Sequence, residues 1–214
     1  MNSSPAESPS HLPDHLAGYA NELAAAQKRL GAGAGDLAAL LDLIIQKPAT
    51  RDQLCDLLET SWGHLQHLRE LLKTLTRVKT DSAECIDALT VAEKAIEADA
   101  PLSFTRLKDA LDAAGADSKK SPVNSRLQSR LAEANALACC LERHYDSAAG
   151  HYQRAAELSE PNQDKDAQWR YKSLQASALC NLGRESLDDH KLSEAVALFQ
   201  AIALELTDQS DDPD

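Results

Sequence analysis

Two histidines stand at a spacing that suits metal binding. His64 and His67 are three residues apart, so on a helix their imidazole rings lie on one face and can reach one ion. No Asp, Glu or Cys near them has an evident claim to complete the ligand set, and a plain pairing on a helix surface is the simpler interpretation. His144 and His151 are seven residues apart, about two helical turns, which is too far to share a small ligand. We therefore expect no metal site.

Catalytic motifs give no stronger indication. The sequence contains no glycine-rich phosphate loop, no Gly-x-Ser-x-Gly elbow and no His-Glu-x-x-His helix. Acidic residues are plentiful, yet each pair of them also fits the solvated face of a helix. We expect a protein that is not an enzyme and needs no cofactor, and an enzyme of unknown class is the third of three functional hypotheses.

The cysteines do not suggest a metal or disulfide framework either. The chain has five of them, Cys55, Cys85, Cys139, Cys140 and Cys180. Their number is odd, none has CxxC spacing, and all lie in helical patterns rather than in loops. We expect reduced thiols that are mostly buried, with Cys180 as a more accessible exception.

Composition predicts an all-α protein. The 214 residues are 43% hydrophobic but only 4% aromatic, and abundant Ala and Leu favour helices over sheets. The net charge of -12 opposes binding to phosphate backbones or anionic lipid, so we expect no nucleic acid and no membrane partner. The first residues lack the apolar core of a signal peptide, and no segment approaches 18 consecutive apolar residues. The expected location is cytoplasmic.

Helical segments must position all of these residues, and caps and breakers indicate where the segments lie. Residues 1–13 are a Ser- and Pro-rich leader and residues 207–214 an acidic tail, and both are expected to be disordered. Residues 14–114 are expected to form N-terminal helical hairpins, and residues 115–125 a loop. Within the first part we expect a helix to about Leu30, a second capped by Asp36 to about Gln46, a long one capped by Thr50, and two more over 81–99 and 101–114.

The long helix carries a leucine seam over residues 54–75. Its members follow alternating three- and four-residue steps, interrupted at Ser61, and are Leu54, Leu58, Leu65, Leu68, Leu72 and Leu75. The simplest use of the seam is packing inside the domain against the next helix, whose Ile86, Leu89 and Ile96 supply a matching stripe. The alternative is a homodimer through the long helix, as in a structural or regulatory subunit that assembles through this seam.

Two C-terminal segments share one pattern of small and aromatic residues. The positions that carry it are Ala148, Tyr152, Ala155, Leu182, Gly183, Ala195 and Phe199. They resemble the tetratricopeptide repeat (TPR), a helix–turn–helix unit, over residues 126–206. The step from position 148 to position 195 exceeds the usual repeat of about 34 residues, and such looser units resemble the arrays of large bacterial regulatory proteins. The resemblance implies an α-solenoid of about nine antiparallel helices with a concave face.

A TPR-like array implies a function in protein–protein interaction, as a scaffold or adaptor. The groove-lining positions of the family fall on Arg130, Glu133 and Leu137, and again on Ser177, Cys180 and Arg184. A partner peptide or helix in this groove is the leading hypothesis. Because Arg184 stands where a carboxylate clamp of this family would need Asn, we expect an internal acidic or amphipathic segment rather than a C-terminal carboxylate.

Overall fold

Helices make up all the secondary structure in the described part of the chain. The computed structural model describes residues 14–77, 82–97, 102–118, 125–159 and 164–210, without the side chains of residues 14, 15, 51, 52, 117, 118 and 208–210. These residues form one 3₁₀ helix, nine α-helices and no strand, which confirms the all-α class. The elements are η1 (Asp14–Tyr19), α1 (Ala20–Leu30), α2 (Ala34–Ile44), α3 (Arg51–Leu75), α4 (Ala83–Ala95), α5 (Phe104–Ser118), α6 (Ser125–Leu141), α7 (Tyr145–Ser159), α8 (Lys165–Ser186) and α9 (Asp189–Ser210).

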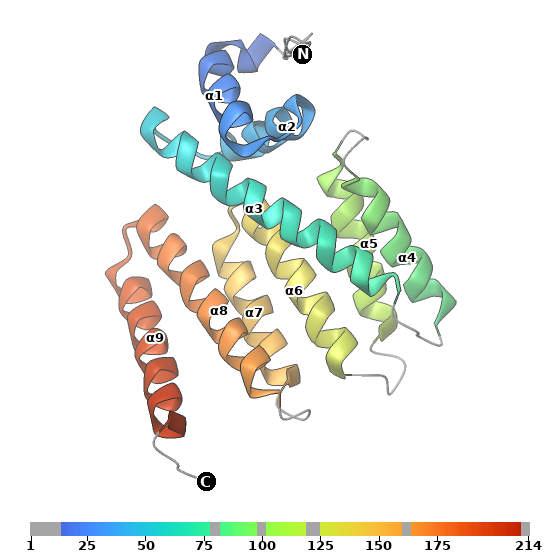
Figure 1. Cartoon of the computed structure of the whole chain (residues 1–214), viewed down its shortest axis with the longest axis vertical. Helices are drawn as coiled ribbons and strands as arrows, with labels where there is room; N and C mark the ends of the chain where they lie inside the picture. Colours follow the sequence, from blue (N-terminus) through green and yellow to red (C-terminus); the bar gives the residue numbers. More distant parts are fainter. Residues whose placement is uncertain (1–13, 78–81, 98–101, 119–124, 160–163, 211–214) are drawn as a thin grey trace, which may run out of the picture.

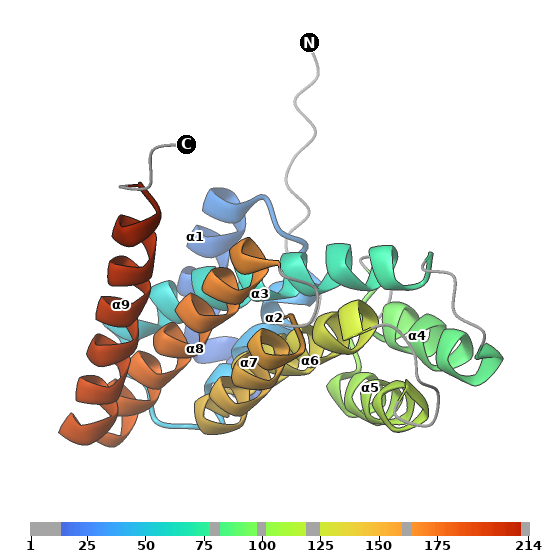
Figure 2. The ribbon, with the colours of Figure 1, turned by 90° about the horizontal axis from the view of Figure 1, so that it is seen from below.

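The last four helices form a row. Figure 1 shows α6 to α9 side by side, with α9 at the edge of the molecule. The most extensive contacts are those of α6 with α7, α7 with α8, and α8 with α9. Helix α3 runs across this row on α6 and also contacts α1, α2 and α4. Helices α4 and α5 pack on each other at the end opposite α9, as Figure 2 shows from a second direction.

Side-chain caps fix several helix starts. Thr50 is the N-cap of α3, as the sequence predicts, and forms a capping box with Gln53. Asp164 caps α8 by accepting a hydrogen bond from the Ala167 N–H. Asp36 is not the cap that we expected, because α2 begins two residues earlier with Gly33 at the N-cap position. Asp36 is instead buried inside α2 and accepts two hydrogen bonds, of 2.9 and 3.0 Å, from the guanidinium of Arg69.

The leucine seam of α3 is buried inside this chain. All six leucines are at most 2% exposed, and they belong to a core cluster that also includes residues of α1, α2, α4, α5 and α6. The expectation that the seam packs mainly on the next helix was wrong. Contacts of α3 with α6, α2 and α1 exceed those with α4, which packs chiefly on α5. The seam therefore joins the N-terminal helices to the C-terminal row.

Two helices extend further than expected, into the predicted loop at 115–125 and into the predicted tail at 207–214. Helix α5 continues to Ser118, so the expected loop at 115–125 is helical in its first four residues, and positions 119–124 lie outside the described residues. Helix α9 continues past Thr207 to Ser210. The leader at 1–13 and the end of the tail at 211–214 also lie outside the described residues.

A second core cluster holds the C-terminal row together with small residues. Ala148, Tyr152 and Ala155 are at most 1% exposed, and Ala195 is 2% exposed. At Gly183 a Cβ atom would lie 2.8 Å from Cγ of Leu192, so α8 and the start of α9 approach as closely as a glycine allows. Leu182 packs against this cluster, whereas Phe199 is 42% exposed.

Candidate functional site

Helix α3 covers the face of α6 on which we expected half of the groove. Glu133 is 0% exposed and Leu137 is 1% exposed, so neither can line a groove that a partner enters. The reason is the crossing of α3, since Leu137 belongs to the same core cluster as the seam leucines and His67 of α3 contacts Glu133. These two expected contact residues are corrected to core positions.

The remaining groove candidates stay accessible but do not form one groove. Ser177 and Arg184 are exposed on α8, and Cys180 is half-buried. Arg130 lines a cavity beside the first turn of α8, whereas Arg184 lines a different cavity near the last turn of α8. The two arginines that we expected to act together on one ligand therefore belong to different surfaces.

Glu133 is the centre of a buried ionic network. Its carboxylate accepts hydrogen bonds from both terminal nitrogens of Arg170, at 2.6 and 3.0 Å, and from the Tyr171 hydroxyl at 3.0 Å. Arg130 donates to it at 3.1 Å from one turn earlier on α6, and His67 Nε2 lies 3.1 Å away. Three helices, α3, α6 and α8, are thus tied to one side chain.

The network keeps Glu133 ionised despite its burial. Burial alone would raise the pKa of this carboxyl, but hydrogen bonds from His67 and Arg170 and the charges of Arg170 and Arg130 outweigh it and lower the pKa to about 2. Burial likewise raises the pKa of the neighbouring Tyr171, helped by the negative charge of Glu133. The carboxylate and the phenol therefore keep fixed protonation states at neutral pH.

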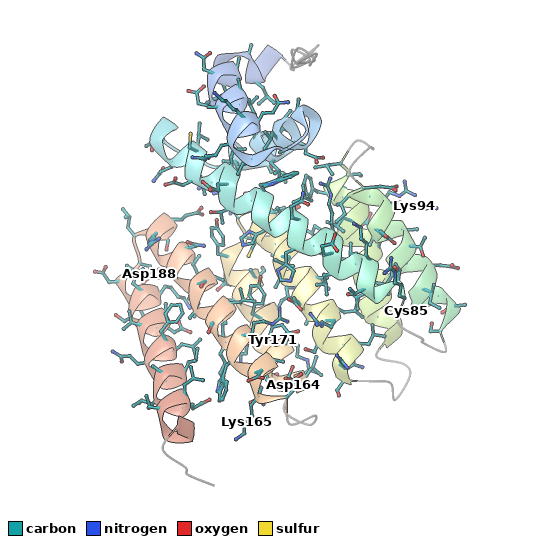
Figure 3. All side chains as sticks on the ribbon, viewed as in Figure 1. Cys85, Lys94, Asp164, Lys165, Tyr171 and Asp188 are labelled. Carbon is teal, nitrogen blue, oxygen red and sulfur yellow. The ribbon has the colours of Figure 1, made fainter. Side chains whose placement is uncertain are left out.

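A cavity of about 470 Å³, which we call the arginine pocket, opens beside this network. Its lining consists of Arg126, Arg130, Arg170, Ser129, Ser159, Asp164, Asp166, Ala167 and Tyr171. They come from α6, the end of α7 and the start of α8. In Figure 3, the labels of Asp164, Lys165 and Tyr171 mark the end of α8 where the pocket lies.

The arginines of the pocket hold unused hydrogen-bond donors. Arg130 donates one bond and Arg170 two bonds to Glu133, out of the five N–H groups that each guanidinium carries. Arg170 is further held by its place over the Tyr171 ring, 4.5 Å from the ring centre. Arg126 is exposed and makes no ion pair among the described residues. The lining can donate to an oxygen-bearing ligand without giving up its own bonds.

A second cavity, of about 510 Å³, lies between α3 and the last turn of α8. Arg143, at its back, is buried, and its guanidinium donates to the carbonyls of Ile44, Lys47 and Pro48 at 2.9, 3.1 and 3.3 Å. The same side chain bonds Glu185 at 2.6 Å. Arg143 thereby ties the end of α2 to the turn between α6 and α7. Its N–H groups are used to hold these elements together, so we do not count Arg143 among the ligand-binding arginines.

His64 and His67, which share a helix face at metal-binding spacing, have different surroundings. His67 contacts Glu133, whereas His64 is mostly buried, and its Nδ1 has no hydrogen-bond partner within the described residues. Burial, with the nearby charge of His67, lowers the pKa of His64 to about 4. No group of three His, Cys, Asp or Glu side chains in the described ranges is arranged to hold a metal ion.

The cysteines are all free thiols, and their burial varies. Cys85 and Cys140 are buried, while Cys55, Cys139 and Cys180 are half-buried, so the expected burial applies fully to two of the five. Burial raises the pKa of Cys140 to about 12. That thiol is therefore protonated at neutral pH and poorly reactive.

Sequence reasoning missed the two residues that complete the arginine pocket. Arg170 and Tyr171 lie between the two segments that carry the repeat pattern and are not part of that pattern. Arg126 and Arg130, four residues apart, share one face of α6, and this spacing was the available signal. Their convergence with Arg170 depends on the packing of α8 beside α6 and α7, which no local pattern shows.

Comparison of the chain with protein-family models, with characterised proteins and with solved structures gave no match. The TPR resemblance and any function therefore depend on the residues and contacts of this chain alone. Among the described helices, none combines the length and apolarity that crossing a bilayer requires.

Proposed function

We propose that this protein is a non-catalytic, TPR-like adaptor that binds one Glu or Asp side chain, within a segment of a partner protein, at the arginine pocket. The observation that carries the proposal is the placement of Arg126, Arg130 and Arg170 around one cavity in a chain of net charge -12. Guanidinium groups bind carboxylates through pairs of N–H donors, so a Glu or Asp side chain is the group that this lining fits best.

Preorganisation supports the proposal. Glu133 and the Tyr171 ring already hold Arg170, and Glu133 holds Arg130, so a ligand need not order these long side chains when it binds. Ordering a flexible side chain costs on the order of 1 kcal/mol, which a prearranged pocket avoids. Arg126, which makes no ion pair with any residue that the structure describes, is the side chain that would close on the ligand.

The acidic residues of the lining limit the kind of ligand. Asp164 and Asp166 stand at the start of α8, so the lining carries three positive and two negative side chains. Asp164 is occupied in part, because it accepts the N–H of Ala167 as the helix cap. We therefore propose a single carboxylate within an otherwise uncharged or amphipathic segment, rather than a run of acidic residues.

The close packing of the C-terminal row supports the repeat architecture of the proposal. Gly183 against Leu192, and the buried Ala148 and Ala155, are the contacts that a TPR-like helix pair needs. The partner site differs from a full-length groove, since α3 lies on the face of α6. The hypothesis of assembly through residues 54–75 is not retained, because the seam leucines are part of the core.

The proposal is tested by measuring whether one carboxylate decides peptide binding. We would screen a peptide library carrying a single fixed Glu, and compare each hit with its Gln counterpart by fluorescence anisotropy. A charge-assisted pair predicts that the Glu peptide binds about tenfold or more tightly than its Gln counterpart. Arg126→Glu should abolish this preference without disturbing the network at Glu133.

The matched control is Arg106→Glu, which makes the same charge change at an exposed position of α5 outside the pocket. It should leave the preference for Glu intact. The proposal fails if no peptide of the library distinguishes Glu from Gln, or if the two variants weaken binding equally, because the effect would then be one of net charge.

A further inference from the structure

The large apolar side chains exposed in the described residues gather at one place. Val196, Phe199, Leu204 and Leu206 lie on α9 and are 53%, 42%, 66% and 45% exposed, and Leu187 lies in the turn just before it. Figures 1 and 2 both show α9 at one end of the molecule. Among the described helices, α8 is the only one with extensive contacts to α9. Helix α9 therefore carries apolar groups that the described part of the chain leaves uncovered.

Five residues of α9 form a stripe with coiled-coil spacing, which we call the outer stripe. They alternate four- and three-residue steps and are Leu192, Val196, Phe199, Ala203 and Leu206. Leu192, the first of the five, also packs on Gly183 of α8. The other residues that α8 covers, Ala195 and Ile202, lie on an adjacent face and are 2% and 6% exposed. The outer stripe is thus a second apolar face of the same helix.

The outer stripe is free of charge. No charged residue occurs from Ala195 to Leu204, although charged residues make up 26% of the chain. The positions along its open flank are Ser193, Gln200 and Thr207, which are polar and uncharged. Glu194 and Glu205, at the two limits, already form ion pairs with Lys191 and Lys172.

We propose that the outer stripe binds the outer stripe of a second copy of this chain, with the two α9 helices antiparallel about a two-fold axis. Charge is compatible with this occupant. Two chains of net charge -12 repel each other, and the repulsion is smallest where they meet through an uncharged surface such as the stripe. A different protein attracted to so acidic a chain would be basic, and the stripe offers it no carboxylate.

Side-chain size also fits a second copy. In an antiparallel pair with coiled-coil spacing, the bulky Phe199 lies beside the small Ala203 of the second copy, and Val196 beside its Leu206. Gln200 then faces Gln200 of the second copy across the axis, where two amides can exchange hydrogen bonds. An isologous contact of this kind closes as a dimer rather than growing into a filament.

The area of the outer stripe sets the expected affinity of the dimer. A helix of 22 residues is about 33 Å long and about 10 Å wide, so its footprint is well below the roughly 800 Å² per partner of a standard interface. We therefore expect a reversible dimer that forms as protein concentration rises. Because both chains are acidic, added salt should strengthen it by screening their repulsion.

The experiment is sedimentation equilibrium of the full chain over a range of concentrations, with two variants that add the same charge to α9. Val196→Glu places a carboxylate in the stripe and should weaken the dimer about tenfold or more, because it buries an unpaired charge. Leu204→Glu, exposed on the same helix about a third of a turn away from the stripe, should leave the dimer constant within about twofold.

Thermal melting at low concentration separates interface from fold. Val196 is exposed in the single chain, so its replacement should leave the melting temperature of the monomer unchanged, and Ala203→Glu provides a second stripe variant with the same expectation. The proposal is overturned if the wild type stays monomeric at the highest concentration. It is also overturned if both stripe variants dimerise as the wild type does, or if Leu204→Glu weakens the dimer as much as they do.

Discussion

Glu133 shows how one residue can change its expected role when a distant helix is placed over it. Its position on α6 suggested a groove contact, yet the side chain is 0% exposed and receives bonds from Arg130, Arg170, Tyr171 and His67. A buried carboxylate is tolerated only when it is paired and hydrogen-bonded. Glu133 therefore acts on the site indirectly, by holding two arginines of the pocket.

Glu133 should make the free energy of unfolding depend on acid. The folded pKa is about 2 and the ordinary value is 4.5, so the stabilisation is complete above pH 4.5 and is lost as pH falls from about 4.5 to about 2. Such a shift corresponds to on the order of 3 kcal/mol. Urea unfolding at several pH values should show that Glu133→Gln is less stable than the wild type at neutral pH. Its unfolding free energy should also lack the wild-type decrease between pH 4.5 and about 2. Glu142→Gln, the control, should keep the wild-type slope.

His64 should produce a second pH dependence at higher pH. Its folded pKa of about 4 lies below the ordinary 6.5, because burial and the charge of His67 disfavour the imidazolium. The unfolded chain then binds the proton first, so stability is complete above pH 6.5 and declines as pH falls toward 4. His64→Gln should flatten unfolding curves in this interval, whereas His144→Gln, at an exposed position, should not. If the unfolding free energy of His64→Gln falls with pH as steeply as that of the wild type, the lowered pKa does not belong to His64.

Arg143 should stabilise the fold through geometry that lysine cannot copy. Its planar guanidinium donates at the same time to Glu185, to the carbonyl of the last residue of α2 and to two carbonyls just after that helix. Arg143→Lys keeps the charge but loses the fork, and we expect a loss of about 2–3 kcal/mol in urea unfolding. Arg154→Lys, at a surface pair with Glu157, should change stability by about 0.5 kcal/mol or less. Equal small effects would show that the charge alone matters.

At the scale of the helix, local signals predicted what local chemistry decides. Thr50 as the cap of α3 and the break after Leu30 follow from hydrogen bonding and from the left-handed conformation at Gly31. Asp36 failed as a predicted cap because Arg69, 33 residues later, binds its carboxylate and draws it into the core. The prediction of Glu133 as a groove contact failed for the same reason, since the partners that bury it come from α3 and α8.

Gly183 should be intolerant of any side chain, in contrast to another helical glycine. A Cβ atom there would lie 2.8 Å from Leu192 Cγ and 3.1 Å from the Asp188 carbonyl oxygen, so Gly183→Ala should overpack the α8–α9 contact by roughly 1–3 kcal/mol. Gly150→Ala, in α7 with open space around it, should instead stabilise by about 0.5–1 kcal/mol. Thermal melting measures both, and a stabilised Gly183→Ala would refute the close approach. Leu192→Ala combined with Gly183→Ala should recover part of the loss.

At the scale of the whole molecule, α3 decides which surfaces are available to partners. It contacts the N-terminal helices and also lies on α6, so its seam is part of the core and it covers one face of α6. The sequence predicted the seam but not its position, because a leucine seam fits any apolar face of the right spacing. The two accessible surfaces that we propose for partners are the arginine pocket at one end of α8 and the outer stripe on α9.

The same arrangement predicts how stability is distributed along the chain. Helix α9 has extensive contacts only with α8 among the described elements, whereas α3 and α6 lie between several neighbours. Local opening should therefore be easiest in α9, and its amides should exchange with deuterium faster than those of α3 and α6 in dilute protein. Raising the protein concentration should slow exchange in α9 alone, since the second copy covers the outer stripe. Val196→Glu should remove this concentration dependence, and Leu204→Glu should keep it. Protection of α9 equal to that of α6 in dilute protein would contradict the predicted order of opening.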